Sequence, residues 1–349
     1  MSLIQPDISR SYKMSRRPIL FLSILTLLLF IANLFMGSVN IPFADAFNVL
    51  LGFETDNKVA ESIVLQSRLP QAITALLAGA SLAVAGLLLQ TAFSNPLAGP
   101  SILGITSGAS LGVAVVMLAT GGVMGAVSGS MTNVLGAFIG AILTLGVIIL
   151  FSMVVRSNVM LLIVGIMVGY VTNSAITLLN FFASEKNVFS YTIWGMGDFS
   201  SVSLSDMPLF VGVSFLGILL SILLVKPLNA LLLGDRYAAN LGVNIKRARV
   251  LLLLCTGLLT AIVTSYCGPI SFLGLAVPHV ARLMTKSSNH HTLLPATLLA
   301  GSATALVCTL VCSMPWQSGV LPLNAITPIF GAPVIIYVII NRSKIEYFN

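Results

Sequence analysis

Charged side chains are scarce in this sequence. Asp, Glu, Lys and Arg make up 8% of its 349 residues, and none stands between Arg68 and Arg156. Water-soluble domains carry about a quarter charged residues, so a large soluble domain is excluded. With 57% hydrophobic residues and a mean hydropathy of +1.03, the composition predicts a polytopic membrane protein.

Groups that perform catalysis are also missing. The sequence has no GxxxxGK[ST] loop and no HExxH motif, and no catalytic residue and no bound cofactor are predicted. No predicted span carries an acid in its middle, where ion-driven carriers usually place an ionisable group. The chain is therefore not expected to be an enzyme. We predict a permease driven by a separate ATPase, with an ion-coupled secondary transporter as the alternative.

Cysteine and histidine, the soft-metal ligands, are few and poorly grouped. Cys308 and Cys312 are one helical turn apart, but no His or acid accompanies them at ligand spacing, which favours buried packing. His279 and the pair His290-His291 leave a metal site as a minor alternative. No metal site is predicted.

Ten apolar runs divide the chain, which agrees with about 20 residues for each membrane crossing. The predicted fold class is all-α, with about ten transmembrane helices in a single domain over residues 1–349 and an N-terminal cytoplasmic tail over 1–18. The third and eighth runs are too short or too interrupted by Gly and Pro to be straight helices. The runs are 19–36, 68–91, 101–119, 132–155, 158–183, 207–232, 250–266, 270–283, 292–312 and 326–341.

The distribution of Lys and Arg predicts the orientation of the spans. If both termini are cytoplasmic, 14 of the 17 basic residues lie inside, and only Lys58, Arg68 and Lys186 lie outside with seven of the ten acids. The net charge of +7 then reflects membrane orientation, and no nucleic-acid partner is expected. The inner basic residues are Arg10, Lys13, Arg16, Arg17, Arg156, Lys226, Arg236, Lys246, Arg247, Arg249, Arg282, Lys286, Arg342 and Lys344, and the outer acids are Asp45, Glu54, Asp56, Glu61, Glu185, Asp198 and Asp206.

Two further patterns concern packing and symmetry. Gly and Ala recur every fourth residue, as in Gly136 and Gly140, which predicts close helix contacts. Residues 99–105 and 268–275 share a Gly-Pro pattern followed by Leu-Gly, and the intervening spans place their starts on opposite sides of the membrane. An inverted repeat of this kind is typical of transporters, with chance similarity as the alternative.

Distinctive residues are densest between Arg68 and Gly112, and three later blocks follow in order. They are Arg68-Leu69-Pro70, Gly79-Ala80, Gly86, Gln90, Asn95-Pro96-Leu97-Ala98, Pro100, Leu103-Gly104 and Gly108-Ala109, then Trp194-Gly195-Met196-Gly197, then 268–275 with 278–283, and last Leu321-Pro322 with Gly331-Ala332-Pro333. Together these blocks resemble the FecCD family of ATP-binding-cassette (ABC) importer permeases, which move iron-siderophores, haem or cobalamin.

The resemblance implies an assembly in the bacterial cytoplasmic (inner) membrane. A second copy of the chain would complete the pathway, two cytoplasmic ATPase subunits would use ATP, and a soluble or lipid-anchored binding protein would deliver the substrate. Membrane lipid surrounds the permease. Which of the three cargoes is carried is not decided by the sequence.

Two inner segments are expected to contact the ATPase. The longest inner connection, 234–249, is interpreted as a coupling loop in which Gly242 ends a short helix, and 279–291 as a second contact. A basic loop that only obeys the charge rule is the alternative. The candidate coupling residues are Asp235, Arg236, Leu241, Gly242, Lys246, Arg247, Arg249, His279 and Arg282.

On the outer side, Arg68 matches a family arginine that docks the binding protein, with Lys58 or Lys186 as substitutes. Gln71 and Ser313 stand where a family member carries two further arginines. Residues 191–199 resemble a short helix at the mouth of the pathway, although Tyr and Trp also favour membrane interfaces. The candidate pathway residues are Tyr191, Trp194, Met196, Asn173 and Asn180, with hydrogen bonding between helices as the alternative for the asparagines.

Overall fold

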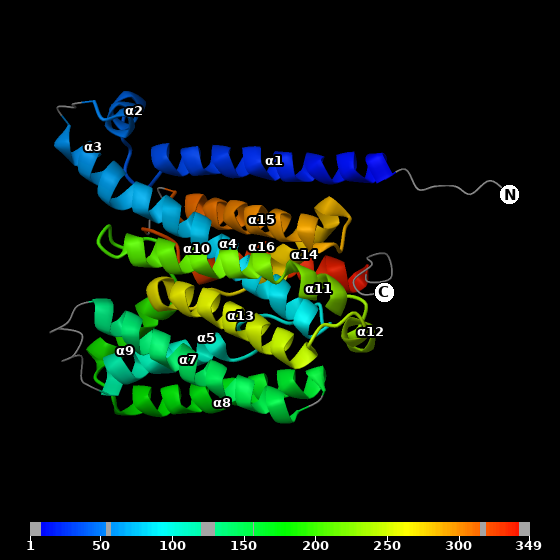
Figure 1. Ribbon diagram of the computed structural model, residues 1–349. Helices are drawn as coiled ribbons and strands as arrows, with labels where there is room; N and C mark the ends of the chain where they lie inside the picture. Colours follow the sequence, from blue (N-terminus) through cyan, green and yellow to red (C-terminus); the bar gives the residue numbers. More distant parts are fainter. Residues whose placement is uncertain (1–7, 54–56, 120–129, 156, 315–318, 342–349) are drawn as a thin grey trace.

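The computed structural model describes residues 8–53, 57–119, 130–155, 157–314 and 319–341. Helices account for the regular structure in these ranges, and no strand occurs in them. The long helices lie roughly side by side, with short helices at both ends of the bundle (Figure 1). The all-α polytopic fold predicted from the composition is thus confirmed.

Each of the ten predicted runs coincides with helical structure. Seven helices are long and apolar enough to span a membrane: α1 (Ile8–Phe35), α4 (Leu69–Ala92, preceded by α3 and η1), α7 (Ser130–Val154), α8 (Asn158–Phe182), α13 (Ile245–Cys267), α15 (His290–Cys312) and α16 (Leu323–Ile340). Helices α10 (Met207–Leu223) and α11 (Val225–Leu231) form one further candidate span, bent by 51°. The third and eighth runs are short, as predicted: α5 (Ile105–Ala114) continues as the π-helical turn η2 (Val115–Ala119), and α14 is Leu273–Thr285.

Five shorter segments lie near the ends of the bundle: α2 (Phe43–Leu51), α3 (Lys58–Ile63), η1 (Val64–Arg68), α9 (Glu185–Gly195) and α12 (Asp235–Asn240). Helix α1 begins at Ile8, so residues 8–18 of the predicted tail are helical, and residues 1–7 lie outside the described ranges. Lys and Arg are good helix formers, which lets the helix extend beyond its apolar part.

Helix α4 is the centre of the packing, with 83% of its most apolar window buried. A β-carbon at Gly79 would overlap the carbonyl oxygen of Gly301 in α15, and one at Gly86 would overlap that of Gly274 in α14. Glycine at these sites lets the helix backbones touch, which provides contact where lipid supplies no hydrophobic driving force. The close packing predicted from small residues is confirmed here.

Glycine-mediated backbone contact also joins α5 to α7. Gly108 lies against the backbone of Gly140, and Gly112 lies against that of Gly136. These contacts place the short helix α5 deep in the second half of the bundle, where Ile105, Ala109 and Val113 are fully buried. Helix α5 is therefore held by packing, although it is too short to cross a membrane alone.

The two halves of the predicted repeat are built alike. Helices α5 and α14 each start after a residue with left-handed backbone geometry, Gly104 (φ 75°) and Phe272 (φ 68°). The segment before α5 follows α4, and the segment before α14 follows α13. The C-terminal ends of α4 and α13 lie at opposite ends of the bundle (Figure 1). The repeats also meet, because a β-carbon at Gly274 would lie 2.9 Å from Cδ of Pro100. These similarities agree with the predicted inverted repeat, which stays a prediction.

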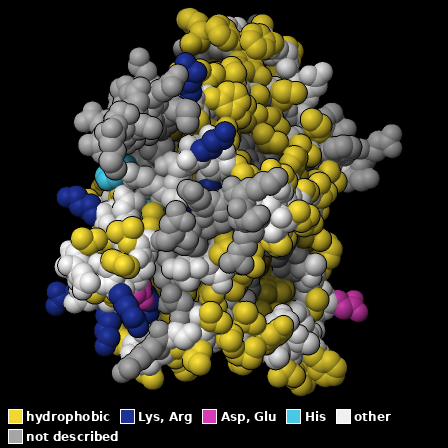
Figure 2. Space-filling model, turned by 90° about the vertical axis from the view of Figure 1, so that its right-hand side faces the viewer, with side chains coloured by type: hydrophobic (Ala, Val, Ile, Leu, Met, Phe, Trp, Pro, Cys, Tyr) yellow, Lys and Arg dark blue, Asp and Glu magenta, His cyan; other side chains and the backbone are white. Residues whose placement is uncertain are grey.

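Charged residues separate to the two ends of the bundle. Figure 2 looks onto the end that carries α12, where the visible charged side chains are mostly Lys and Arg. Several residues of the predicted inner basic and outer acidic sets lie outside the described residues or have undescribed side chains. They are Arg10, Lys13, Arg16, Arg156, Arg342, Lys344, Glu54 and Asp56. Among described side chains, the basic end has Arg17, Lys226, Arg236, Lys246, Arg247, Arg249, Arg282 and Lys286 with Asp235, and the acidic end has Asp45, Glu61, Glu185, Asp198 and Asp206 with Lys58, Arg68 and Lys186.

Candidate functional site

At the basic end, α12 forms a short, well-defined projection. Gly242 adopts a left-handed conformation (φ 84°) and its N–H donates to the carbonyl of Ala239 at 3.0 Å, so the prediction that Gly242 ends a short helix is confirmed. Ala238 is fully buried and anchors the helix, whereas Tyr237 and Leu241 are 69% and 65% exposed. Two large apolar side chains thus face outward on a capped helix.

The charges around α12 are mostly unpaired. Arg249 Nη2 lies 3.3 Å from Asp235 Oδ2, the one ion pair found within the described ranges. Arg236, Lys246 and Arg247 are exposed, and Asn244 caps α13 by accepting from the Arg247 N–H. Residues 245–249 therefore belong to the first turns of α13, whereas the sequence had suggested a loop to 249.

The second predicted coupling segment is partly interior. His279 is fully buried and Arg282 is 4% exposed, so neither side chain presents itself at the surface in this conformation. Arg282 donates to Gln90 Oε1 at 3.0 Å, and Gln90 donates to the carbonyl of Leu275 at 3.1 Å. His279 Nε2 donates to the carbonyl of Pro96 at 2.8 Å. A coupling role for these residues stays a prediction, and it would act through the placement of α14 and the 95–99 segment.

A neighbouring buried network holds the start of α15. His290 Nε2 lies 2.8 Å from Thr91 Oγ1, and the His290 backbone N–H donates to Asn229 Oδ1 at 2.8 Å. Asn229 also donates to Asn289 at 3.0 Å, which links α11 to α15. Residues far apart in sequence are thereby joined behind the basic end. Gln90, Thr91 and Asn229 were not predicted, although a glutamine inside an apolar run is a signal of a buried polar contact.

At the acidic end, Arg68 is 5% exposed and bonds to backbone. Its guanidinium donates to the carbonyls of Leu34 (3.2 Å), Phe35 (2.7 Å) and Val39 (2.5 Å). The last carbonyls of a helix lack partners inside the helix, so Arg68 caps the end of α1. Docking of the binding protein by Arg68 stays a prediction, and it would compete with the hydrogen bonds from Arg68 to these three carbonyls. Lys58, at the start of α3, is exposed.

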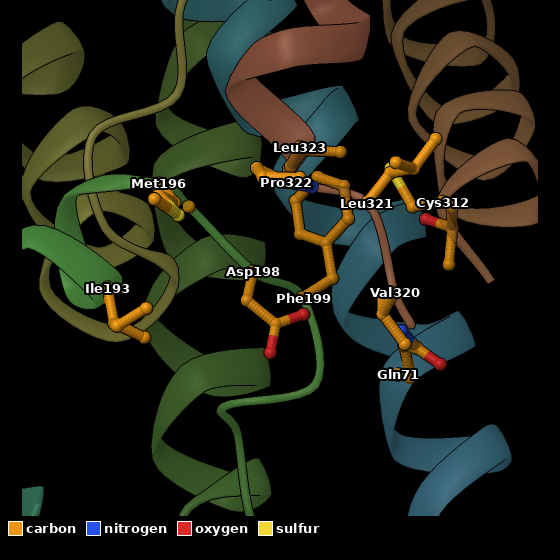
Figure 3. Close-up of a pocket in the computed structure, with 12 residues that line it drawn as sticks. Gln71, Ile193, Met196, Asp198, Phe199, Cys312, Val320, Leu321, Pro322 and Leu323 are labelled. Atoms are coloured by element: carbon orange, nitrogen blue, oxygen red, sulfur yellow. The ribbon is translucent and has the colours of Figure 1, made fainter. Parts of the chain in front are cut away.

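A cavity of about 230 Å³ opens at the acidic end (Figure 3). Its walls come from the start of α4, the turn after α9, the end of α15 and the segment before α16. Asp198 lies among otherwise uncharged lining residues, and its carboxylate accepts the Ser200 N–H at 2.9 Å. The cavity is lined by Gln71, Ile193, Met196, Gly197, Asp198, Phe199, Thr309, Cys312, Val320, Leu321, Pro322 and Leu323.

Asn324 ties these walls together and was not predicted. Its Nδ2 donates to the carbonyls of Gly195 and Pro269, and its Oδ1 accepts the Ser271 N–H at 3.1 Å. Its backbone N–H donates to the carbonyl of Met196 at 3.0 Å. One side chain therefore fixes the end of α9, the segment before α14 and the start of α16.

Of the predicted mouth residues, Met196 lines the cavity. Tyr191 and Trp194 do not line it and instead pack against each other. Their rings stack with centroids 5.9 Å apart, and Tyr191 donates to the carbonyl of Ser110 at 3.4 Å. Burial raises the pKa of Tyr191 to about 12, so its hydroxyl stays protonated at neutral pH. The helix itself spans Glu185–Gly195, earlier than the expected 191–199.

The two predicted asparagines of α8 differ in exposure. Asn173 is exposed with Ser174 and Thr177, and Asn180 is half-buried near the outer end. Only 28% of the most apolar window of α8 is buried, so polar groups stand on a largely uncovered helix. Their role as pathway residues stays a prediction.

The four cysteines are free thiols buried in the bundle, as the packing interpretation predicted. Within the described ranges, no group of three or more His, Cys, Asp or Glu side chains is arranged to hold a metal ion.

Comparison with known proteins identifies the family. Residues 25–341 match the FecCD transport family. The chain belongs to this family. Among its relatives, the vitamin B12 import system permease protein BtuC of Klebsiella pneumoniae is 33% identical over 283 residues, covering 80% of this chain and 83% of BtuC. The hemin transport system permease protein HmuU of Yersinia pestis is 29% identical over 325 residues, covering 93% and 95%.

A solved structure shares the fold of this FecCD chain. It is described as an inward-facing conformation of a metal-chelate type ABC transporter, with a TM-score of 0.80, 27% identity, and coverage of 93% of this chain and 99% of its own. The chain is accordingly a multi-pass membrane permease of an ABC importer and a transport component rather than an enzyme. The resemblance read from the sequence blocks is confirmed.

Proposed function

We propose that two copies of this FecCD chain form the pathway of an importer for an iron-siderophore, haem or cobalamin in the bacterial inner membrane. The basic end, with both termini, faces the cytoplasm and seats two ATPase subunits. The acidic end receives a substrate-binding protein. ATP is used by the partner subunits, and the chain binds no cofactor. The names of BtuC and HmuU support cobalamin and haem within this range of cargoes.

The exposed surface of α12 is the observation that carries the coupling proposal. Exposed Tyr237 and Leu241 stand among Arg236, Lys246 and Arg247 on a helix fixed by Gly242 and by buried Ala238. Aromatic and arginine side chains on a rigid support are typical of the centre of a protein interface. The Arg249–Asp235 pair also links α12 to α13, and we infer that movement of the ATPase reaches the bundle through this contact.

The exposed polar face of α8 supports the proposal that the pathway contains a second copy of the chain. Asn173, Ser174 and Thr177 are exposed in the monomer on a membrane-length helix. Polar side chains that face hydrocarbon are costly, whereas they are tolerated against another subunit or a water-filled path. We infer that this face of α8 borders the pathway between two copies.

Binding-protein docking is assigned to the exposed cations of the acidic end. Lys58 and Lys186 are exposed, whereas Arg68 is committed to the end of α1. Exposed charge pairs contribute roughly 0–1 kcal/mol each, so docking would depend on several contacts.

Uptake into vesicles tests the proposal. Vesicles contain the chain alone or with its ATPase, and the cargoes are haemin, cobalamin and a ferric siderophore, each with its binding protein. We expect uptake of one cargo class that requires the ATPase and ATP. Uptake by the chain alone under a proton or sodium gradient would instead establish the ion-coupled transporter.

Removal of the exposed apolar groups tests the coupling surface. Tyr237→Ala with Leu241→Ala is expected to weaken co-purification of the ATPase at least tenfold, because about 2 kcal/mol is typical for losing central interface residues. Leu204→Ala, at a residue 52% exposed near the acidic end, is the matched control. Unchanged ATPase binding by a folded double variant would remove α12 from the interface.

A further inference from the structure

We propose that a groove between α1 and α14 at the basic end binds the headgroup of an anionic phospholipid. The groove has a volume of about 420 Å³ and is lined by Arg17, Pro18, Phe21, Met284, Thr285 and Lys286. Its two cations come from different elements, one from α1 and one from the residue that ends α14. The groove shares no residue with the coupling surface of α12 or with the cavity at the acidic end, whereas Met284, Thr285 and Lys286 belong to the predicted second contact, 279–291.

The depth of the groove matches the membrane surface. The apolar part of α1 that is long enough to span a membrane begins at Arg17. From there, Leu20, Phe21 and Ile24 are 62%, 56% and 51% exposed, as expected for side chains that face lipid. Arg17 therefore lies where headgroups meet hydrocarbon, and Phe21 lies one turn deeper.

The position of Lys286 is fixed by the backbone. Lys286 adopts a left-handed conformation (φ 49°, ψ 38°), and its N–H donates to the carbonyl of Arg282 at 2.8 Å. Non-glycine residues seldom adopt this geometry, and here it turns the chain at the end of α14 beside α1. The side chains of Arg17 and Lys286 are both exposed, and no carboxylate among the described residues lines the groove.

The chemistry of the lining favours a lipid over a free anion. Arginine and lysine together suit a phosphate group, because both donate charge-assisted hydrogen bonds. Phe21, Met284 and Pro18 provide an apolar surface that an inorganic phosphate would not use and that an acyl chain would cover. Basic pockets between transmembrane helices are known lipid headgroup sites, and each cation near the surface strengthens attraction to anionic lipid.

Native mass spectrometry of the purified permease tests the site. Phosphatidylglycerol and phosphatidylcholine are added separately to the wild type and to the variant Arg17→Gln with Lys286→Gln. We expect preferential retention of phosphatidylglycerol by the wild type and roughly tenfold or greater weakening in the double variant. Lys226→Gln with Arg236→Gln removes the same charges from the same end, outside the groove, and is expected to keep most of the preference. Equal loss in both variants, or none in the first, would overturn the proposal.

A second measurement uses the unaltered chain. A phosphatidylglycerol analogue with a photoreactive acyl chain is expected to label peptides that contain Phe21 or Met284, and inorganic phosphate at millimolar concentration is expected not to displace it. Labelling confined to other helices would refute the groove. Complete displacement by phosphate would identify a simple anion site and would equally reject the lipid.

Discussion

Arg68 illustrates how one charged residue can be retained at the edge of a membrane for structural reasons. Its three carbonyl partners lie 29 to 34 residues earlier in the chain, at and beyond the end of α1. Buried hydrogen bonds to a charged group contribute about 1.5–3 kcal/mol. The guanidinium therefore joins α1 to the start of α4, and its planar fork cannot be reproduced by lysine.

Arg68→Lys is expected to lower the free energy of unfolding by about 2 kcal/mol, because an ammonium cannot reach all three carbonyls. Thermal unfolding of the detergent-purified protein measures the loss. Lys186→Gln, at an exposed residue of the same end, is the control and is expected to change stability little. If Arg68→Lys keeps full stability and loses only binding-protein affinity, Arg68 acts as a docking charge.

Asn324 controls the order of the cavity walls. Asn324→Asp is expected to be worse than Asn324→Ala, because a carboxylate would face the carbonyls of Gly195 and Pro269. Hydrogen exchange of residues 193–199 and 268–272 measures the loosening, and we expect faster exchange in both segments. Unchanged exchange in the aspartate variant would show that backbone contacts alone hold the mouth.

At the scale of elements, backbone contact between helices organises the bundle. Gly79 with Gly301, Gly86 with Gly274 and Gly108 with Gly140 join α4, α5, α7, α14 and α15. The short helices α5 and α14 depend on this contact, since neither crosses a membrane by length. The two short helices of the predicted repeat are thus each packed against longer helices.

Gly86→Ala is expected to destabilise the protein by about 1–3 kcal/mol or more, because the added β-carbon meets the fixed backbone of Gly274. Gly146→Ala is the matched control, since no atom lies within 4 Å of its added β-carbon, and a gain of about 0.5–1 kcal/mol is expected. Denaturation midpoints of the two variants give the comparison. Equal stability of the two would mean that α4 and α14 can separate without cost.

At the scale of the whole molecule, charge separation predicts the orientation. A cysteine at Asn240 is expected to react with a membrane-impermeant maleimide only from the cytoplasmic side, and one at Ser205 only from the outside. Background labelling is low because the native cysteines are buried. The reverse pattern would invert the orientation and move the ATPase to the other end.

The sequence predicted well what depends on local pattern and poorly what depends on distant partners. Apolar length located all ten runs, and Gly242 marked the end of α12. The partners of Arg68, the burial of His279 and Arg282, and the role of Asn324 were missed, because Asn324 binds Gly195 across 129 residues. Hydropathy does not record which polar groups meet inside a bundle. The start of α1 at Ile8 was also missed, because helix propensity extends the helix beyond its apolar segment.

The direction of ATP-driven uptake tests the central claim most directly. Vesicles are prepared with the α12 end facing inward, and the ATPase with ATP is enclosed while binding protein and cargo are supplied outside. The proposed function predicts accumulation of cargo inside that stops when ATP or the ATPase is omitted. Accumulation at the same rate without the ATPase would contradict it.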